Sequence, residues 1–233
     1  GIYIALSGSV LKQGQLDTLS HNIANANTVG FKKDRASFRE FLVSGISGMS
    51  DSDDGRAMSD LSEVKTDFGE GHQFKTGNPL DVAIAGEGFL SLEGNRYTRK
   101  GDLQIGRDGY LVTQGGRRVL GVDGPIQLPP GRIDISTSGE VSVDGNRVGA
   151  LKIVEFGNTG TLVELEDGQY TTPETPVRST SSVASGHLEG SNVDVVKEMV
   201  QMITTLREFE MYQKAIKAFD DAAGRVNAEM AKV

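Results

Sequence analysis

The sequence has no cysteine among its 233 residues. A disulfide framework and a thiolate metal site are therefore excluded, and the redox compartment stays open. The three histidines, His21, His72 and His187, lie in separate segments without the spacing of a metal site. We therefore expect no metal and no other cofactor.

Long apolar runs are also missing. No stretch approaches the roughly 18 consecutive apolar residues of a membrane span. The opening residues, Gly-Ile-Tyr-Ile-Ala-Leu-Ser-Gly, lack the basic region and long apolar run of a cleavable signal peptide. If the protein works outside the cytoplasm, we expect it to be exported without a cleavable signal peptide, by another route.

Positive charge is scarce as well. The net charge is -8, and no basic stretch exceeds Lys32 and Lys33 with Arg35 and Arg39 nearby. A protein of this charge is a poor electrostatic partner for nucleic acid, so we expect no nucleic-acid binding. The hydrophobic fraction of 37% and the 30 glycines predict a modest core and many turns.

Signatures of catalysis are not present. The sequence contains no G-x-S-x-G elbow, Walker A loop or H-E-x-x-H helix. A glycosidase needs only two carboxylates in a cleft, but nothing distinguishes Asp67, Glu70, Asp81 or Glu87 from solvated acids. The acidic residues 51–54 do not fit a calcium loop, because Ser62 stands where a glutamate is required. We predict neither an enzyme nor a small-molecule substrate.

The most regular pattern in the chain lies in residues 191–233. Apolar residues recur there at alternating three- and four-residue steps, which predicts one long amphipathic helix of about 60 Å. Ser191 and Asp194 have the spacing of a capping box at its start. The helix could belong to the core of one globular domain, or it could form a coiled-coil seam with another helix of the same or a neighbouring chain. The main seam residues are Val195, Met199, Met202, Leu206, Phe209, Ile216 and Phe219.

A weaker helical stripe occupies residues 2–28. Leu16, Leu19 and Ile23 belong to it, and its pairing with the C-terminal helix would cover both apolar faces. The helix leads into a sharp turn rich in asparagine and glycine, residue types that accept left-handed backbone geometry. The predicted turn residues are Asn22, Asn25, Asn27, Gly30 and Phe31.

The middle of the chain has a different texture. Residues 43–77 are polar and predict a linker or an extended arm. Residues 78–185 alternate short β-prone runs with turn dipeptides such as Asp108-Gly109 and Asp144-Gly145, which is typical of a β-sandwich or a small irregular barrel. The predicted class is α+β: residues 1–42 and 186–233 form a discontinuous helical domain, and residues 78–185 form a β-rich domain inserted in it.

Several motifs resemble a known family. The stretch from His21 to Lys32 (HNIANANTVGFK), after an amphipathic helix, is similar to the N-terminal signature of the bacterial flagellar rod, hook and hook-associated axial proteins. Residues 81–89, the hairpin around Tyr97-Thr98-Arg99-Lys100-Gly101-Asp102, and residues 188–203 resemble further parts of this family, in the same order. The short length and residues 209–221 resemble the proximal rod subunits most, with the distal rod second and the hook a further alternative.

The resemblance implies a mechanical function. Terminal helices of neighbouring subunits would stack into a hollow rod in the basal body, spanning the periplasm, and the β domain would form the outer layer. Partners would be copies of the chain, other rod proteins and the flagellar type III export apparatus. Rod subunits of this kind transmit torque and leave a channel for the export of later subunits. Two alternative hypotheses are a cell-wall enzyme with a cleft in the β domain and a β-sandwich adhesin.

Overall fold

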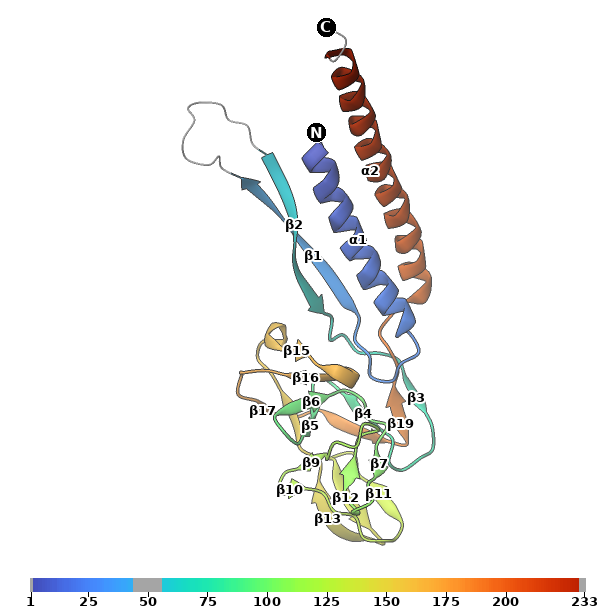
Figure 1. Ribbon diagram of the computed structural model, residues 1–233. Coiled ribbons are helices and arrows are strands. Elements are labelled where there is room, and N and C mark those ends of the chain that lie inside the picture. Colours follow the sequence, from blue (N-terminus) through green and yellow to red (C-terminus); the bar gives the residue numbers. More distant parts are fainter. Residues whose placement is uncertain (1, 44–55, 231–233) are drawn as a thin grey trace. The chain divides into compact units, whose positions relative to one another are not determined.

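The fold comprises an N-terminal helix, a mostly β central region and a C-terminal helix (Figure 1). The computed structural model describes residues 2–43 and 56–230, with the side chains of residues 2–37 and 64–225. The α+β class predicted from the sequence is thereby confirmed. The chain divides into two compact units. The helical unit comprises Gly1–Ala24, Asp34–Lys65 and Asp194–Val233, and the β unit comprises Asn25–Lys33 and Thr66–Val193.

The helical unit contains two helices and a two-stranded sheet. The helices are α1 (Ile2–Ala24) and α2 (Val195–Met230), and the sheet pairs β1 (Asp34–Val43) with β2 (Arg56–Thr66). At 36 residues, α2 is about 54 Å long. The segment 43–77, expected to be a linker or arm, thus contains β2 and the short β3 (Gln73–Lys75). Residues 44–55 lie outside the described part of the chain.

The end of α1 and the start of α2 differ from the boundaries predicted from the sequence. The first helix ends at Ala24 rather than near residue 28, because the chain turns there and the Thr28 amide donates to the Asn25 carbonyl. The predicted cap of the second helix is wrong by three residues. Asp194 is the cap, since its Oδ1 accepts from the amide of Lys197 at 3.1 Å. Ser191 instead accepts a hydrogen bond from the amide of Val193 in the preceding turn.

The β unit is built from short antiparallel strands. Its largest sheet has the order β15-β16-β6-β5-β14-β17, a three-stranded sheet has the order β11-β12-β13, and four further pairs are β9-β10, β4-β18, β3-β19 and β7-β8. The remaining strand bounds are β4 (Val82–Ala85), β5 (Phe89–Leu92), β6 (Arg96–Thr98), β7 (Gln104–Ile105), β8 (Leu111–Val112), β9 (Leu120–Gly121), β10 (Gly124–Pro125), β11 (Ile133–Ile135), β12 (Glu140–Val143), β13 (Asn146–Ala150), β14 (Ile153–Glu155), β15 (Val163–Glu164), β16 (Gln169–Thr171), β17 (Val177–Arg178), β18 (Ser182–Ser185) and β19 (His187–Glu189). Two 3₁₀ turns, Thr159–Thr161 and Glu166–Gly168, flank β15.

The core of the β unit consists of two hydrophobic clusters. An aliphatic cluster includes Val82, Leu90, Leu111 and Val141, all nearly or fully buried. An aromatic cluster is formed by edge-to-face contacts among Phe68, Phe89, Tyr97, Phe156 and Tyr170. The predicted turns between strands are also observed. In each predicted turn dipeptide a glycine has a positive φ, and in Gly115-Gly116 it is the second glycine. These glycines are Gly94, Gly109, Gly116, Gly124, Gly139, Gly145 and Gly168.

Candidate functional site

The helical unit brings the two ends of the chain side by side. Ser9 contacts Gln213, Lys12 contacts Glu208 and Asn22 contacts Glu198, so the two helices run antiparallel (Figure 1). The Lys12 ammonium lies 2.6 Å from the Glu208 carboxylate, and Gln213 donates to the Ser9 hydroxyl at 3.0 Å. A Cβ placed on Gly8 would lie 2.6 Å from the Tyr212 ring, so a glycine at this position allows the ring to lie against the α1 backbone.

Asn22 ties the end of α1 to the first strand. Its amide group accepts from the Asp34 amide at 2.8 Å and donates to the Asp34 carbonyl at 2.9 Å. The same Nδ2 lies 3.4 Å from a carboxylate oxygen of Glu198 on α2. Asn22 and Glu198 are both buried. A side chain that is donor and acceptor at once is required here, which explains an asparagine in an otherwise helical stretch.

The predicted seam residues differ in exposure. Leu19 is buried, and the half-buried members are Leu16, Ile23, Met202, Phe209 and Ile216. The exposed members are Val195, Met199, Leu206 and Phe219. The most buried positions of α2 are polar instead, at Glu198 and Thr205. The α1-facing stripe of α2 is therefore partly polar, and four of the ten predicted seam residues are exposed in the single chain.

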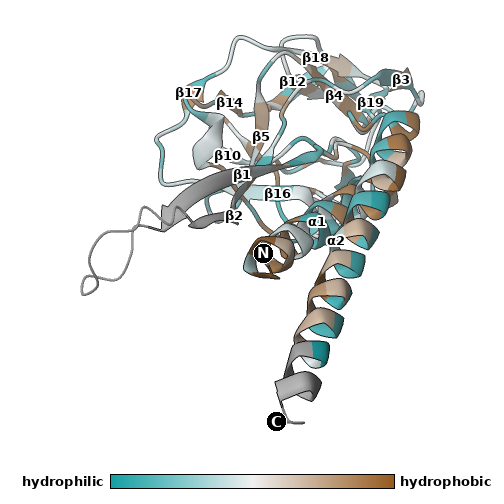
Figure 2. Cartoon of the chain, turned by 90° about the horizontal axis from the view of Figure 1, so that it is seen from above, coloured by the Kyte–Doolittle hydropathy of each residue, from teal (hydrophilic) through white to brown (hydrophobic). Residues whose placement is uncertain are grey.

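Apolar residues alternate with polar ones along both helices (Figure 2), and several of the apolar ones are exposed. On α2, Val196, Val200 and Met211 are 74%, 60% and 62% exposed. On α1, the exposed set comprises Ile2, Tyr3, Ile4, Leu6 and Val10. Single exposed apolar residues are common, but a continuous series of them along two adjacent helices is typical of an interaction surface.

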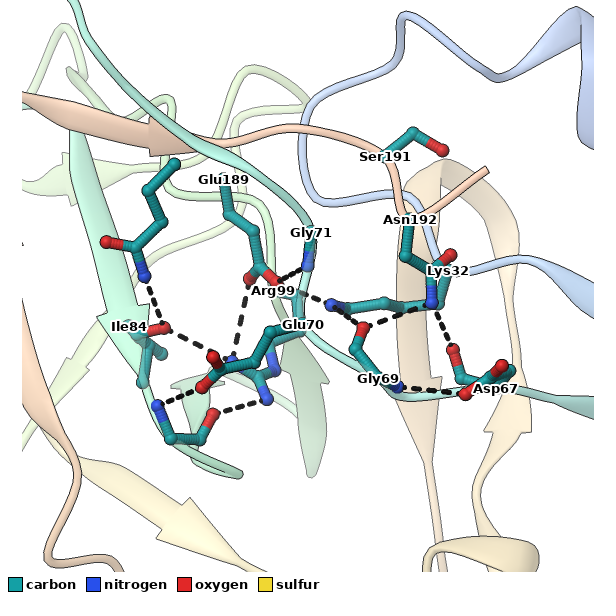
Figure 3. A network of polar contacts seen from close by, with 12 residues as sticks. Lys32, Asp67, Gly69, Glu70, Gly71, Ile84, Arg99, Glu189, Ser191 and Asn192 are labelled. Carbon is teal, nitrogen blue, oxygen red and sulfur yellow. Dashed lines mark hydrogen bonds and ion pairs between the residues drawn. The ribbon is translucent and has the colours of Figure 1, made fainter. Parts of the chain in front are cut away.

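A buried charge network lies inside the β unit (Figure 3). The Lys32 ammonium is 2.6 Å from Glu189 Oε1, and the Arg99 Nη1 is 3.5 Å from Glu189 Oε2. The three side chains are 0%, 2% and 1% exposed for Lys32, Arg99 and Glu189. The network joins three segments: Lys32 lies after α1, Arg99 follows β6, and Glu189 ends β19. Charges removed from water to this degree are costly unless paired, so the pairing decides whether these three segments can stay together.

Hydrogen bonds to the backbone support the network. Lys32 also donates to the Gly69 carbonyl at 2.8 Å, and the Gly71 amide donates to Glu189 at 2.8 Å. Arg99 donates to the Gly86 carbonyl at 2.7 Å, and its guanidinium carbon lies 5.1 Å from the centre of the Phe89 ring. Each charged group therefore has at least two partners, but Arg99 Nε and Glu189 Oε2 are buried without a hydrogen bond to any residue that the structure describes, so the cluster is only partly satisfied.

Two glycines permit the close approach of backbone segments around the network. Gly30 has φ +66°, and a Cβ on it would lie 2.7 Å from the Arg99 carbonyl carbon. Its amide donates to the Glu189 carbonyl at 2.7 Å. A Cβ on Gly71 would lie 1.9 Å from the Gly190 carbonyl oxygen. At both positions a side chain would push apart the segments that the charges join.

Asn192 fastens the segment beyond β19. Its side chain accepts from the Lys33 amide at 2.8 Å and donates to the Asp67 carbonyl at 2.7 Å. The Asp67 amide in turn donates to the Lys33 carbonyl at 2.8 Å. Residues 25–33, 66–71 and 187–192 therefore form one junction, named here the three-segment junction.

Burial changes the protonation equilibria of the two cations. Burial lowers the pKa of Lys32, and the hydrogen bond and charge of Glu189 oppose that shift. Burial likewise lowers the pKa of Arg99, again against the opposing charge of Glu189. Desolvation is the larger cause for both groups, so the network carries a desolvation cost that the carboxylate of Glu189 offsets only in part.

Three family profiles match the chain: a flagella basal body rod protein profile at residues 2–32, a flagellar hook protein FlgE/F/G D1 domain profile at 83–143, and a flagellar basal body rod FlgEFG protein C-terminal profile at 184–229. The flagellar basal-body rod protein FlgF of Escherichia coli is 34% identical to the chain, covering 97% of it and 96% of the relative. The chain belongs to the flagellar basal-body rod protein family. It is a structural subunit of the rod in the flagellar basal body.

Other rod proteins match nearly as well. The flagellar basal-body rod protein FlgG of Agrobacterium fabrum is 31% identical over 97% of the chain and 98% of its own length. FlgG of Bacillus subtilis is 32% identical over 94% of the chain and 95% of its own length. The resemblance inferred from the sequence motifs is therefore confirmed, and the family is a structural one rather than a family of enzymes.

The predicted turn residues of this rod protein have separate tasks. Asn22 bonds to β1, whereas Asn25 accepts from the Thr28 hydroxyl at 3.1 Å and so shapes the turn locally. Gly30 and Phe31 are buried in the β unit, and Asn27 is exposed. Within the three-segment junction, Gly30 and Phe31 are therefore buried, whereas Asn27 lies on the exposed side.

Three of the four acids considered for catalysis, Asp67, Glu70 and Asp81, accept structural hydrogen bonds. Asp67 accepts from the Gly69 amide at 3.0 Å, and Asp81 accepts from the Thr76 hydroxyl at 2.6 Å. Glu70 accepts from the Gly86 amide at 2.6 Å. Within residues 2–43 and 56–230, no group of three or more potential ligands could hold a metal ion. In the same residues, no helix has the length and apolar character needed to span a membrane.

Sequence reasoning missed the buried charges. Each of the three charged residues, Lys32, Arg99 and Glu189, lies inside a motif that carries the family resemblance. A single charged residue in a sequence is normally expected to be exposed to solvent, so none of the three was predicted to be buried. The available signal was their position: each stands within two residues of a glycine, in a run that also contains a buried apolar or aromatic side chain. Their convergence depends on pairings between distant segments that local patterns do not encode.

Proposed function

We propose that the chain is a proximal rod subunit that assembles through its paired terminal helices with copies of itself and with other rod proteins. The observation that carries the proposal is the series of exposed apolar side chains on α1 and α2, exemplified by Val200 and Met211. A surface helix with such a face gains stability only when a partner covers it. Each exposed side chain would contribute about 1 to 2 kcal/mol on burial, before ordering costs.

In the assembled rod, the helices would form a coiled-coil-like inner layer around a channel through which later subunits are exported. The predicted seam residues Val195, Met199, Leu206 and Phe219 would contact neighbouring subunits, since they are exposed in the single chain. The β unit, with its two hydrophobic clusters, would form the outer layer as a sandwich-like domain. The rod would transmit motor torque across the periplasm, and its subunits would reach it through the flagellar type III export apparatus.

The proximal assignment is supported by the FlgF relative from Escherichia coli, which covers almost the whole chain. FlgG proteins match at similar identity, so a distal rod subunit is the alternative. Deletion of the gene distinguishes these positions: loss of a proximal subunit leaves no distal rod attached beyond it. Cryo-electron tomography of the basal bodies in the deletion strain would show which part of the rod is missing.

A charge placed in the apolar face tests the assembly surface. Leu206→Asp should prevent incorporation into basal bodies and abolish motility, because a carboxylate buried between helices without a partner is strongly unfavourable. Lys214→Asp is the matched control, since Lys214 is an exposed position of the same helix and receives the same side chain. Purified basal bodies and swimming assays provide the measurement.

The β unit must remain folded in the variant for this result to bear on assembly. Near-ultraviolet circular dichroism of the purified Leu206→Asp protein should match that of the unchanged chain, because Leu206 lies in the helical unit. Normal rod assembly and motility with Leu206→Asp would sink the proposal that this face joins subunits.

A further inference from the structure

Two adjoining hollows open on the surface of the β unit. The first has a volume of about 650 Å³ and is lined by three arginines, Arg107, Arg117 and Arg118. The second has a volume of about 620 Å³ and is lined by Leu128 and two prolines, among others. Ile105, Gly106 and Arg107 line both hollows, so the turn after β7 forms a ridge between them. One continuous surface therefore presents a basic hollow beside an apolar one.

The basic hollow has more cation than its own acids neutralise. Arg118 is paired with Asp108 at 2.6 Å, and Glu93 also lines the hollow. Neither Arg107 nor Arg117 has an acidic partner within the residues that the structure describes. This local excess of positive charge belongs to a chain with 32 acidic and 24 basic residues. A guanidinium without an acidic partner is suited to bind a carboxylate through two parallel hydrogen bonds.

One of the arginines is held in place, and a second is partly buried. Arg118 lies over the Tyr110 ring, with its guanidinium carbon 4.3 Å from the ring centre, while it also binds Asp108. The Nε of Arg117 is buried, and it donates to no acceptor within the described part of the chain. A side chain that is already restrained loses less conformational freedom on binding, so Arg118 is preorganised, and the unpartnered Nε of Arg117 leaves a buried donor that an acidic ligand could satisfy.

The apolar hollow indicates that the ligand is a protein segment. Ile105 on the ridge is 46% exposed, and Pro129 and Pro130 bring rigid apolar rings that have no amide donors. A free oxyanion would contact only the basic hollow. A protein segment with an acidic residue next to an apolar one would fill both, as expected of an interface with an apolar centre and a polar rim.

We propose that the two hollows form one docking groove for an extended acidic segment of a second copy of this chain. The inference rests on the proposed assembly into a rod, which places copies of the chain beside one another. The excess of acidic residues in each copy supplies the complementary charge. The groove would then fix the contact between neighbouring β units, separately from the contacts made by the helices.

Photocrosslinking in assembled rods tests the groove. A benzophenone side chain placed at Ile105 should crosslink to a second copy, and mass spectrometry should find the crosslinked peptide rich in Asp or Glu. Arg107→Glu with Arg117→Glu should lower the crosslink yield by about fivefold or more, because attraction becomes repulsion at two positions. Arg178→Glu, an exposed arginine of the β unit outside this groove, is the matched control and should leave the yield unchanged.

The outcomes separate the groove from the proposed function. If the benzophenone-bearing chain is found in basal bodies but crosslinks to no second copy, or if the double variant crosslinks as well as the control, the groove proposal is overturned. If the unmodified chain is itself missing from the rod, the proposed function fails instead. Titration of the purified protein with inorganic phosphate, followed by NMR, should show no saturable binding at Arg117, and tight phosphate binding would identify a small-anion site in place of a protein groove.

Discussion

Lys32 and Glu189 form an ion pair with 2.6 Å between Nζ and Oε1, and both side chains are inaccessible to water. The pair joins residues that are 157 positions apart, directly after α1 and in the strand that leads toward α2. Arg99 reaches the other oxygen of the same carboxylate at 3.5 Å. One buried carboxylate thus holds two buried cations from different segments, and several consequences can be measured.

Loss of the carboxylate should destabilise the chain more than loss of either cation. Glu189→Gln leaves two buried cations unpaired, and we expect it to lower the free energy of unfolding of the β unit by about 3 to 5 kcal/mol. Lys32→Met should cost less, because Arg99 still neutralises Glu189. Urea denaturation followed by near-ultraviolet circular dichroism gives the midpoints. Equal midpoints for the two variants would show that the three charges do not act as one cluster.

The lowered pKa of Lys32 predicts a dependence of stability on alkaline pH. Between the folded pKa and 10.5, the unfolded chain binds more protons than the folded chain at this residue. The contribution of Lys32 to the free energy of unfolding should therefore rise with pH in that window, and Lys32→Met should remove the rise. Burial raises the pKa of Tyr97, which acts in the opposite direction above pH 10, so the difference between the two proteins is the quantity to measure.

That difference should be followed in urea midpoints at intervals from about pH 7 to pH 10.5. As pH rises, we expect the free energy of unfolding of the unchanged chain to increase steadily relative to that of Lys32→Met. A gap that is constant across the whole range would contradict a lowered pKa at Lys32.

Gly30 should tolerate no side chain. Gly30→Ala combines a strained positive φ with a Cβ that would lie 2.7 Å from the backbone of Arg99. Gly116→Ala is the matched control, because Gly116 has φ +78° with nothing within 4 Å of the added Cβ. We expect a loss of about 1 to 2 kcal/mol for the control and at least about 3 kcal/mol for Gly30→Ala. Thermal unfolding of both variants would measure the difference, and equal losses would mean that the contact with Arg99 is not restrictive.

Asn22→Asp should weaken the helical unit. The new carboxylate would lose the donor to the Asp34 carbonyl and would face the Glu198 carboxylate across about the 3.4 Å that now separates Nδ2 from it. We expect a loss of about 2 to 4 kcal/mol at neutral pH, with partial recovery below about pH 4, where a protonated carboxyl can donate again. Hydrogen exchange of the α1 amides would report it.

Asn22→Ala is the control for that experiment, since it removes the hydrogen bonds without adding charge. Its loss should be smaller at neutral pH, and it should show no recovery in acid. If the alanine and aspartate variants behave alike at every pH, proximity to Glu198 has no energetic effect.

The elements with regular local patterns were predictable from the sequence. The three- and four-residue steps gave α2 to within a few residues, and dipeptides such as Asp144-Gly145 marked turns whose glycines have positive φ. The start of α2 was misplaced because both Ser191 and Asp194 are good capping residues. Only the observed hydrogen bond from Lys197 to Asp194 distinguishes them.

The three-segment junction was beyond local reasoning. From the sequence, a glycine such as Gly71 is expected in a turn. In the structure Gly71 is required for another reason, because the Gly190 carbonyl occupies the space that a Cβ would take. The exposures of α2 were likewise unpredictable from periodicity, because Glu198 and Thr205 are buried while the apolar Val200 is exposed. Which face of a helix is covered depends on the partner, and hydrophobic spacing identifies only the faces that benefit from one.

The long sequence separation within the three-segment junction has a temporal consequence. A chain delivered from its N-terminus presents Lys32 long before Glu189, so the lysine lacks its Glu189 partner until just over four-fifths of the 233 residues have emerged. Closing a loop of this length slows the native encounter, and the β unit cannot reach its final free energy before then. The β unit can therefore complete its folding only after the segment that leads into α2 has emerged. A chain truncated before this segment would lack the Glu189 carboxylate that neutralises the buried Lys32 and Arg99.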